Sequence, residues 1–243
     1  MQEHQFDLTT DDGEMPTWVM RPDGDGPYPV VLFLMDAPGM RQELRDMAMR
    51  LATSGYYVMT SQLYYRTVRE YCLFEDPEGG RDRMYELMNG LPNDLVDADA
   101  AAMLRHAGSD AAADETNVGV VGYCMSGPMA ISVAAAHSGV IKAAASMHGV
   151  RLATDKPDSP HLRVAAVTGE VYVAHAELDT HIDEAQVAEF EAALNASDAT
   201  GWVERYPGID HGFTFPSRGQ IYDRMGAETH WERLLDLLSR NLA

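Results

Sequence analysis

Cysteine is scarce in this sequence of 243 residues, and its two cysteines, Cys72 and Cys124, are too few for a disulfide framework. They form no Cys-x-x-Cys pair, and no cysteines and histidines are spaced like the ligands of a zinc site. We therefore expect neither a bound metal nor a cofactor.

Basic residues are also few, because 18 lysines and arginines stand against 38 aspartates and glutamates, a formal net charge of −20. Such a chain repels nucleic acid and anionic membrane surfaces. No segment is apolar over the length needed to span a membrane, and the N-terminus lacks the basic start and apolar core of a signal peptide. We expect a cytoplasmic protein whose partner is a small molecule, and the sequence indicates no oligomeric state.

The sequence does contain a regular alternation of short apolar runs with helical patterns, and its hydrophobic fraction of 46% suffices for a sizeable core. Strands are expected at 3–9, 15–21, 30–35, 56–60, 118–121, 141–148, 170–175 and 201–206. Helices are expected at 43–54, 81–89, 93–107, 127–137, 184–196 and 227–240. The alternation predicts one α/β domain over residues 1–243, with a mostly parallel, doubly wound sheet flanked by helices. The active site of such a sheet lies at the carboxyl ends of its strands.

The stretch from Asn117 to Ala130 organises these predictions. An apolar run typical of a buried strand breaks at Gly122, small residues surround Cys124, and a helical pattern follows. This is the pattern of a nucleophile elbow with cysteine in place of serine. The backbone N–H of Met125 would lie at a helix N-terminus, where it can stabilise an oxyanion and favour a thiolate.

Two other interpretations of this stretch remain open. A lone cysteine in apolar surroundings is often only a buried structural residue. Ser126 could also be mistaken for the nucleophile, but Cys124 rather than glycine stands two positions before it. We assign Ser126 to the support of the turn or to the helix N-cap.

The ends of the later strands complete a constellation. Asp179 follows the strand at 170–175, and His211 follows the last strand, in a loop where Gly212 frees the backbone. The order Cys124, Asp179, His211 is nucleophile, acid and histidine, as in α/β-hydrolases. Asp179 would hold His211 in the productive tautomer and stabilise its cation.

Other residues compete for these roles. Glu177, Asp183 and Glu184 lie close to Asp179 in the sequence. His148 ends a strand and is a candidate to line the pocket. His175 and His181 flank Asp179 and could touch the site, but packed or solvated roles are favoured for them. Tyr123, within the elbow, is a further candidate for contact with substrate.

The motifs Gly122-Tyr-Cys-Met-Ser-Gly127 and Tyr206-Pro-Gly-Ile-Asp-His-Gly-Phe213, together with the strand leading to Asp179, resemble the dienelactone hydrolase (carboxymethylenebutenolidase-like) family of α/β-hydrolases. The resemblance covers nearly the whole chain. It implies the α/β-hydrolase fold, a Cys124–His211–Asp179 triad, and an oxyanion hole formed by the N–H groups of Met125 and Ala37.

The resemblance also implies that a carboxylate at Asp36 contacts the resting thiol, although the family often has glutamate there. It further implies arginines that bind a substrate carboxylate. Arg81 matches one of them, while the other is absent just after His211, where Arg218 is the nearest arginine.

The sequence thus predicts a cysteine-dependent hydrolase of a lactone or carboxylic ester, which acts through a thioester acyl-enzyme. The alternative is a thiol-redox or non-catalytic binding protein on the same scaffold, since thiolates also react with peroxides. The arginine-rich segment 61–92 is a candidate pocket wall, and its arginines could equally pair with surface acids.

Overall fold

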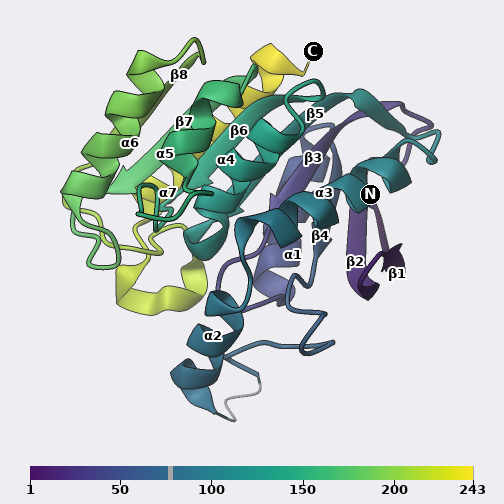
Figure 1. Cartoon of the computed structure of the whole chain (residues 1–243). Coiled ribbons are helices and arrows are strands. Elements are labelled where there is room, and N and C mark those ends of the chain that lie inside the picture. The colour runs from purple at the N-terminus through teal and green to yellow at the C-terminus, as the bar shows by residue number, and fades with distance from the viewer. Residues whose placement is uncertain (76–78, 243) are drawn as a thin grey trace.

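The fold, seen in a computed structural model that describes residues 1–75 and 79–242, is built on one eight-stranded sheet (Figure 1). The strand order is β1-β2-β4-β3-β5-β6-β7-β8. All neighbours from β4 to β8 in this order run parallel, and β1 and β2 add an antiparallel hairpin at one edge. The strands are β1 (Gln2–Thr10), β2 (Gly13–Arg21), β3 (Tyr28–Leu34), β4 (Tyr57–Ser61), β5 (Ala113–Tyr123), β6 (Ile141–Met147), β7 (Glu170–Ala176) and β8 (Gly201–Tyr206).

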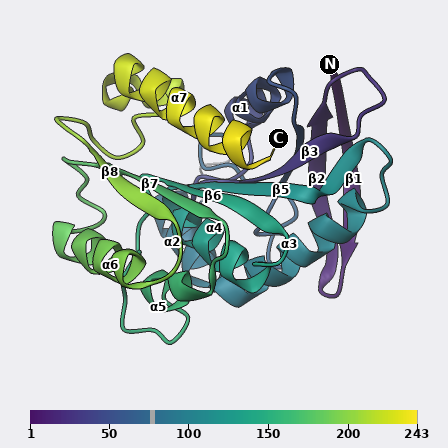
Figure 2. The same ribbon diagram turned by 90° about the horizontal axis from the view of Figure 1, so that it is seen from above.

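Helices cover both faces of the sheet, as Figure 2 shows. One face carries α1 (Gln42–Thr53) and α7 (Arg224–Asn241), and the other carries α3 (Asn93–Ala107), α4 (Gly127–Ala136), α5 (Pro160–Arg163) and α6 (Glu184–Ala196). Helix α2 (Gly80–Asn89) stands apart from both layers, below the sheet in Figure 1. The prediction of an α/β-hydrolase fold with a doubly wound, mostly parallel sheet is confirmed.

The boundaries differ from the predictions where the sequence is polar. Strand β5 begins at Ala113, ahead of its apolar run, because its first residues pair with Tyr28 and Pro29 before a shift of register. Helix α7 begins at Arg224, where the Asp223 carboxylate accepts a hydrogen bond from the Gly226 N–H at 2.7 Å. The segment 150–166, for which no helix was predicted, contains the short helix α5 and a 3₁₀ turn at 164–166.

Helix α4, which follows the elbow, is apolar around its whole circumference. Its residues from Gly127 to Ala134 are all buried, between the sheet and helices α3 and α5. A helix of this kind is held by packing on every side, so the residues at its N-terminus are rigidly placed. No helix among residues 1–75 and 79–242 is both long enough and apolar enough to cross a membrane.

A buried hydrogen bond joins α7 to the end of β5. The His230 Nδ1–H donates to the Ala227 carbonyl at 2.7 Å, so its Nε2 accepts the Tyr123 hydroxyl at 3.0 Å. Both side chains are completely buried. Burial lowers the pKa of His230 to about 4, and the ring is therefore neutral in the folded protein near neutral pH.

This buried histidine predicts sensitivity to acid. Between pH 6.5 and about 4 the unfolded chain binds a proton on His230 and the folded chain does not, so stability falls as the pH falls through this window. Between pH 7.5 and pH 5 we expect this residue to account for a loss of about 2 kcal/mol. Urea unfolding of H230Q at the two pH values should show a smaller difference than the wild type. The exposed-site variant H4Q is the control, and an equal difference in all three proteins would contradict the assignment.

Candidate active site

The candidate nucleophile lies in a strained turn between β5 and α4. Cys124 has a φ of +55°, in the left-handed region that residues other than glycine rarely adopt, and it opens a 3₁₀ turn at Cys124–Ser126. Such strain costs of order 1–3 kcal/mol and is concentrated at functional sites. The structure thus has the strand, sharp turn and helix of a nucleophile elbow.

Two glycines near Cys124, at positions 122 and 127, leave no room for a side chain. A Cβ on Gly122 would lie 2.0 Å from the Ser126 carbonyl oxygen, and a Cβ on Gly127 would lie 2.5 Å from the Gly149 Cα. Any side chain at either position would push the strand and the helix apart. The small residues noted in the sequence therefore have a steric cause.

Ser126 supports the turn and is not placed as a nucleophile. Its buried hydroxyl donates to the Leu34 carbonyl at 3.0 Å and accepts the Tyr123 N–H at 2.9 Å. It makes no side-chain cap bond to α4, so of the two predicted roles the structure has the first. The hydroxyl fastens the end of β3 to the elbow.

Asp179 and His211 are brought together at the carboxyl ends of β7 and β8. His211 Nδ1 lies 2.6 Å from Asp179 Oδ2, and Asp179 Oδ1 accepts the His181 N–H at 2.8 Å. The side chain of Asp179 has no exposed surface. Because Nδ1 is engaged by Asp179, Nε2 is the ring nitrogen left to face the thiol.

The electrostatics of His211 are those of a charged imidazole. Burial alone lowers its pKa, but hydrogen bonds to Asp179 and Cys124 and the charges of both groups raise the pKa to about 10. The ring is therefore protonated at neutral pH, and a cation beside a cysteine favours the thiolate.

Two further imidazoles flank the ring of His211. The ring of His148 lies edge-on to that of His211, with 4.9 Å between the ring centroids. The ring of His181 also lies edge-on to that of His211, with 4.6 Å between the centroids. Burial, together with the nearby His211, His230 and Arg218, holds the pKa of His148 well below its usual value. A neutral His148 can pack against the cationic ring without repelling it.

The structure differs from the prediction for both His148 and His181. His148 is completely buried and bonds through Nε2 to the Thr214 hydroxyl at 3.0 Å, so the prediction that it lines the pocket is wrong. His181, expected to be packed or solvated, lines the cavity above Cys124. Its position two residues after Asp179 is the signal that left this contact open in the sequence.

The carboxylate of Asp36 is held by arginine. Arg41, which the sequence reasoning missed, donates to both Asp36 oxygens at 2.6 and 3.1 Å, and an Arg218 nitrogen lies 3.8 Å away. Asp36 is completely buried and does not line the cavity. Its predicted contact with the substrate is therefore wrong for the described residues, whereas its predicted contact with the Cys124 thiol stays a prediction.

A cavity of about 570 Å³ lies above Cys124. Its walls come from the segment after β3, the segment before α2, α2 itself and the loops after β6, β7 and β8. The described lining residues are Ala37, Pro38, Leu73, Phe74, Gly80, Arg81, Met84, Tyr85, Met88, Asn89, Cys124, Val150, Arg151, His181, His211, Arg218 and Ile221.

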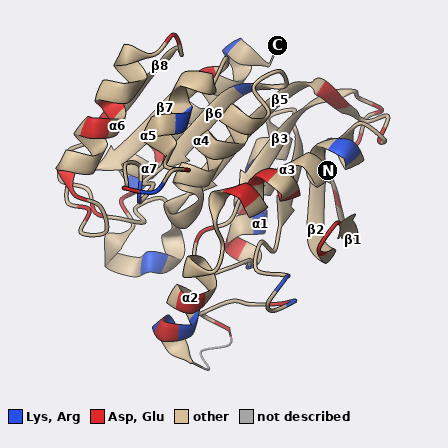
Figure 3. Cartoon of the chain, viewed as in Figure 1, with Lys and Arg blue, Asp and Glu red and all other residues tan. Residues whose placement is uncertain are grey.

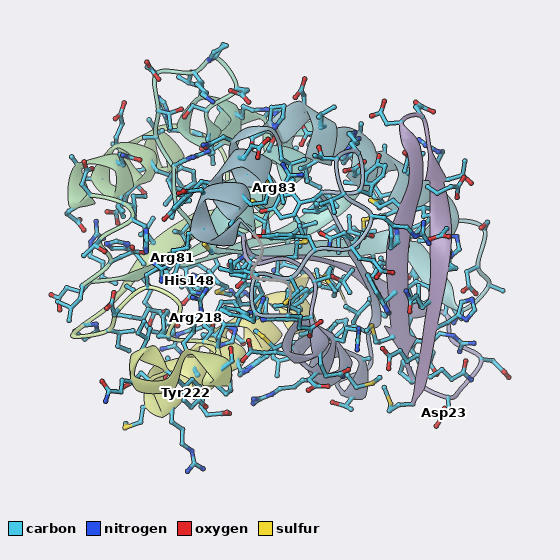
Figure 4. All side chains as sticks on the ribbon, turned by 90° about the horizontal axis from the view of Figure 1, so that it is seen from below. Asp23, Arg81, Arg83, His148, Arg218 and Tyr222 are labelled. Atoms are coloured by element: carbon cyan, nitrogen blue, oxygen red, sulfur yellow. The ribbon has the colours of Figure 1, made fainter. Side chains whose placement is uncertain are left out.

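Three of these residues are arginines and none of the described ones is acidic. Arg81 and Arg218 both line the cavity, and they are labelled in the view from below in Figure 4. Arg151 was not predicted, and its signal would have been the distance of only three residues from a strand end. Figure 3 shows acidic residues on the outer helices and loops. The described lining of the cavity, which has arginines and no acid, therefore differs in charge from these outer elements.

Tyr123 does not reach this cavity. It is completely buried, its hydroxyl bonds to His230, and its ring packs against Phe33 and Phe215. Its predicted contact with substrate is wrong, because alternate residues of a strand point to opposite faces and this one faces α7.

The arginines of segment 61–92 divide into two groups. Arg66, Arg69 and Arg83 form ion pairs with acidic side chains, as the alternative interpretation expected, whereas Arg81 lines the cavity. Residues 73, 74, 80, 81, 84, 85, 88 and 89 make the segment a pocket wall. Residues 76–78 of the same segment lie outside the described part of the chain.

The two cysteines are separate free thiols. Cys72 is buried and Cys124 is partly exposed, with no disulfide between them. Within the described ranges, no three or more histidine, cysteine or acidic side chains are grouped as they would be to hold a metal ion.

Comparison with known proteins gives one consistent family. The sequence model of the dienelactone hydrolase family matches residues 15–242. A curated relative from Escherichia coli O157:H7, named "Putative carboxymethylenebutenolidase", is 30% identical over 230 residues, which are 91% of this chain and 81% of the relative. A "Probable 2-oxo-3-(5-oxofuran-2-ylidene)propanoate lactonase" from Bradyrhizobium is 23% identical over 241 residues, 97% of this chain and 93% of the relative.

Solved structures agree with this assignment. A "Putative Dienelactone Hydrolase" from Klebsiella pneumoniae superposes with a TM-score of 0.87 at 25% identity over 98% of both chains. A dienelactone hydrolase-like promiscuous phosphotriesterase from metagenomic libraries has the same fold, with a TM-score of 0.84 at 17% identity over 100% of this chain and 99% of the other. The chain therefore belongs to the dienelactone hydrolase family and is a hydrolase with the α/β-hydrolase fold.

Proposed function

We propose that this protein hydrolyses a lactone or carboxylic ester that carries a second, free carboxylate, with Cys124 as nucleophile. The observation that carries the proposal is the turn at Cys124, which holds the thiol at one end of a hydrogen-bonded His211–Asp179 pair. The names of the carboxymethylenebutenolidase and lactonase relatives support an ester or lactone as the substrate.

The first half of the reaction makes a thioester. The Cys124 thiolate attacks the acyl carbon, and the carbonyl electrons move to an oxygen held by the N–H groups of Met125 and Ala37. When this intermediate collapses, the C–O bond to the leaving alcohol breaks and the protonated His211 gives its Nε2 proton to the departing oxygen. In a lactone the alcohol stays attached to the acyl group, so the ring opens without loss of a fragment.

The second half returns the enzyme to its resting form. Neutral His211 accepts a proton from water, whose oxygen attacks the thioester carbon and forms a second oxyanion in the same hole. The C–S bond then breaks, the product leaves as a carboxylic acid, and the thiolate is again paired with protonated His211. Asp179 holds the tautomer and stabilises the cation in both halves.

The arginines of the cavity supply the selectivity for an anion. Arg81, Arg151 and Arg218 converge on one cavity whose described lining has no acid. In a chain with a net charge of −20, an anionic substrate needs such a local cationic site to overcome the surrounding field. Guanidinium groups bind carboxylates with charge-assisted and often bidentate hydrogen bonds.

The nucleophile can be tested by comparing the two cysteines. We expect C124A to lower the turnover of p-nitrophenyl acetate by about a thousandfold or more, because the remaining oxyanion hole alone is a weak catalyst. C72A is the matched control and should keep its turnover. Mass spectrometry of the quenched wild type should place the acyl group on Cys124. Full activity of C124A, or peroxide consumption faster than ester turnover, would favour the thiol-redox alternative.

The role of Asp179 can be read from the pKa of His211. In D179N the ring loses its carboxylate partner, so its pKa should fall from about 10, and kcat should fall by about a hundred- to ten-thousandfold. The pKa can be followed by NMR of the labelled imidazole, and the pH dependence of iodoacetamide alkylation of Cys124 gives an independent record. An unchanged His211 titration in D179N would remove Asp179 from the triad.

Carboxylate selectivity can be tested with two esters that differ in one charge. We expect R81A and R218A each to lower kcat/KM for mono-p-nitrophenyl succinate by about tenfold or more relative to p-nitrophenyl acetate, because each loses a hydrogen bond to a charged group. R83A is the matched control, since Arg83 lies on the same helix but pairs with Glu86 at 2.7 Å outside the cavity. Equal losses on both esters would show that the arginines do not recognise the carboxylate.

A further inference from the structure

A second cavity lies beside the one above Cys124. Its volume is about 360 Å³, and its walls are the end of α2 with the start of α3, the start of α4, and the loop from Val150 to Pro160. Four residues line both cavities: Met88, Asn89, Val150 and Arg151. Among the described residues, the two cavities therefore share one wall.

The second cavity begins within one residue of the nucleophile. Met125, which follows Cys124, is part of its lining, and the Val150 N–H donates to the Cys124 carbonyl at 3.2 Å. A substrate whose acyl carbon is on the Cys124 sulfur therefore has two cavities within reach.

Part of the wall of the second cavity is apolar, and most of the rest of its described lining is polar, with Asp155, Lys156 and Asp158 among it. The apolar part contains Met88, Leu91, Met125, Pro128 and Met129, and the four of these that are not Pro128 are at most 9% exposed. Methionine side chains adapt to ligands of different shape. The main cavity is rich in arginine, so the two cavities suit different chemical groups. An apolar cavity of about 150 Å³ can hold benzene, and a volume of 360 Å³ is ample for a phenyl group.

One side-chain pair divides the two cavities. Arg151 Nη2 donates to Asn89 Oδ1 at 2.7 Å, and both side chains are exposed to solvent. Arg151 also has a φ of +56°, a strained conformation, and it lines both cavities. A carboxylate is a stronger acceptor for a guanidinium than a neutral amide oxygen is. A substrate carboxylate in the main cavity can therefore draw Arg151 from Asn89.

We propose that the second cavity is a subsite for an uncharged, apolar arm of the substrate, and that Arg151 admits this arm when it turns from Asn89 to the substrate carboxylate. The inference rests on the proposed function, because it takes Cys124 as the point where the two arms meet. It adds a substrate class: an ester or lactone with a carboxylate on one arm and an aryl or alkyl group on the other.

The subsite can be tested by binding, without turnover. The probe is 6-phenylhexanoate, which has a carboxylate and an apolar arm and no ester bond, and acetate is the reference. Thr154 lines the second cavity only, so T154W fills it, and T200W places the same side chain on an exposed site outside both cavities. We expect T154W to weaken the binding of 6-phenylhexanoate about tenfold relative to the binding of acetate. T200W should leave the ratio of the two dissociation constants unchanged. N89A should strengthen 6-phenylhexanoate a few-fold, because Arg151 no longer has to leave its partner.

Equal ratios in the wild type, T154W and T200W would overturn the subsite. If T154W does not fold, a crystal structure of the wild-type complex decides: a phenyl ring in the second cavity supports the proposal, and a ring in the main cavity overturns it. Neither result depends on the Cys124 chemistry, which is tested separately by C124A turnover of p-nitrophenyl acetate.

Discussion

The strained backbone of Cys124 depends on a close approach of β5, α4 and the segment after β6, where glycines leave no room for a further side chain. Gly127 and Gly149 touch backbone to backbone, and the Ser126 hydroxyl replaces a strand hydrogen bond that the turn cannot make. The strain is stored because α4 is buried on every side and cannot retreat. The packing of these backbone segments thus positions the Cys124 sulfur without any contribution from His211 or Asp179. The same packing fixes the N–H of Met125, a proposed oxyanion donor, so one rigid turn holds it together with the proposed nucleophile.

The sequence could predict those features whose signal lies in neighbouring residues, such as the end of an apolar run. The elbow, Asp179 and His211 each end an apolar run, and the parallel sheet then brings such ends to one edge. The side chains Asp36, Tyr123 and His148 also lie at strand ends, yet they face the core. Whether a residue at a strand end faces the cavity depends on the pleat and on the elements packed below it. Arg41 and Arg151 had no periodic pattern to reveal them, since both lie in irregular backbone where tertiary contacts decide the direction of the side chain.

The arginines of this acidic chain fall into two groups, one buried within the fold and one that lines the cavity. Arg41 is buried between the rings of Phe74 and Phe215 and is neutralised by Asp36 and Glu43, so its role is structural. A buried pair of this kind is costly to break, because removal of one partner leaves an uncompensated charge. The cavity arginines have a different environment, with no acid among the described lining residues and with solvent access. Positive charge therefore serves two purposes: Arg41 is held inside the fold, whereas the cavity arginines, including Arg218 at 3.8 Å from Asp36, are open to the cavity.

The buried network around Arg41 also connects these two purposes. Glu43, which accepts from Arg41, accepts the Ser217 N–H at 2.8 Å and the Ser217 hydroxyl at 2.7 Å. This fastens the loop that carries Arg218 to the start of α1, directly after the segment that supplies Ala37. The loop that carries Arg218 is therefore tied to the segment of Ala37, whose N–H is a proposed oxyanion donor, through an ion pair that does not line the cavity. A carboxylate bound by Arg218 would then be positioned relative to the acyl carbon through a rigid path, which is what productive orientation requires. Loss of Glu43 should loosen this path without altering the triad, so the ion pair acts on orientation and not on the nucleophile.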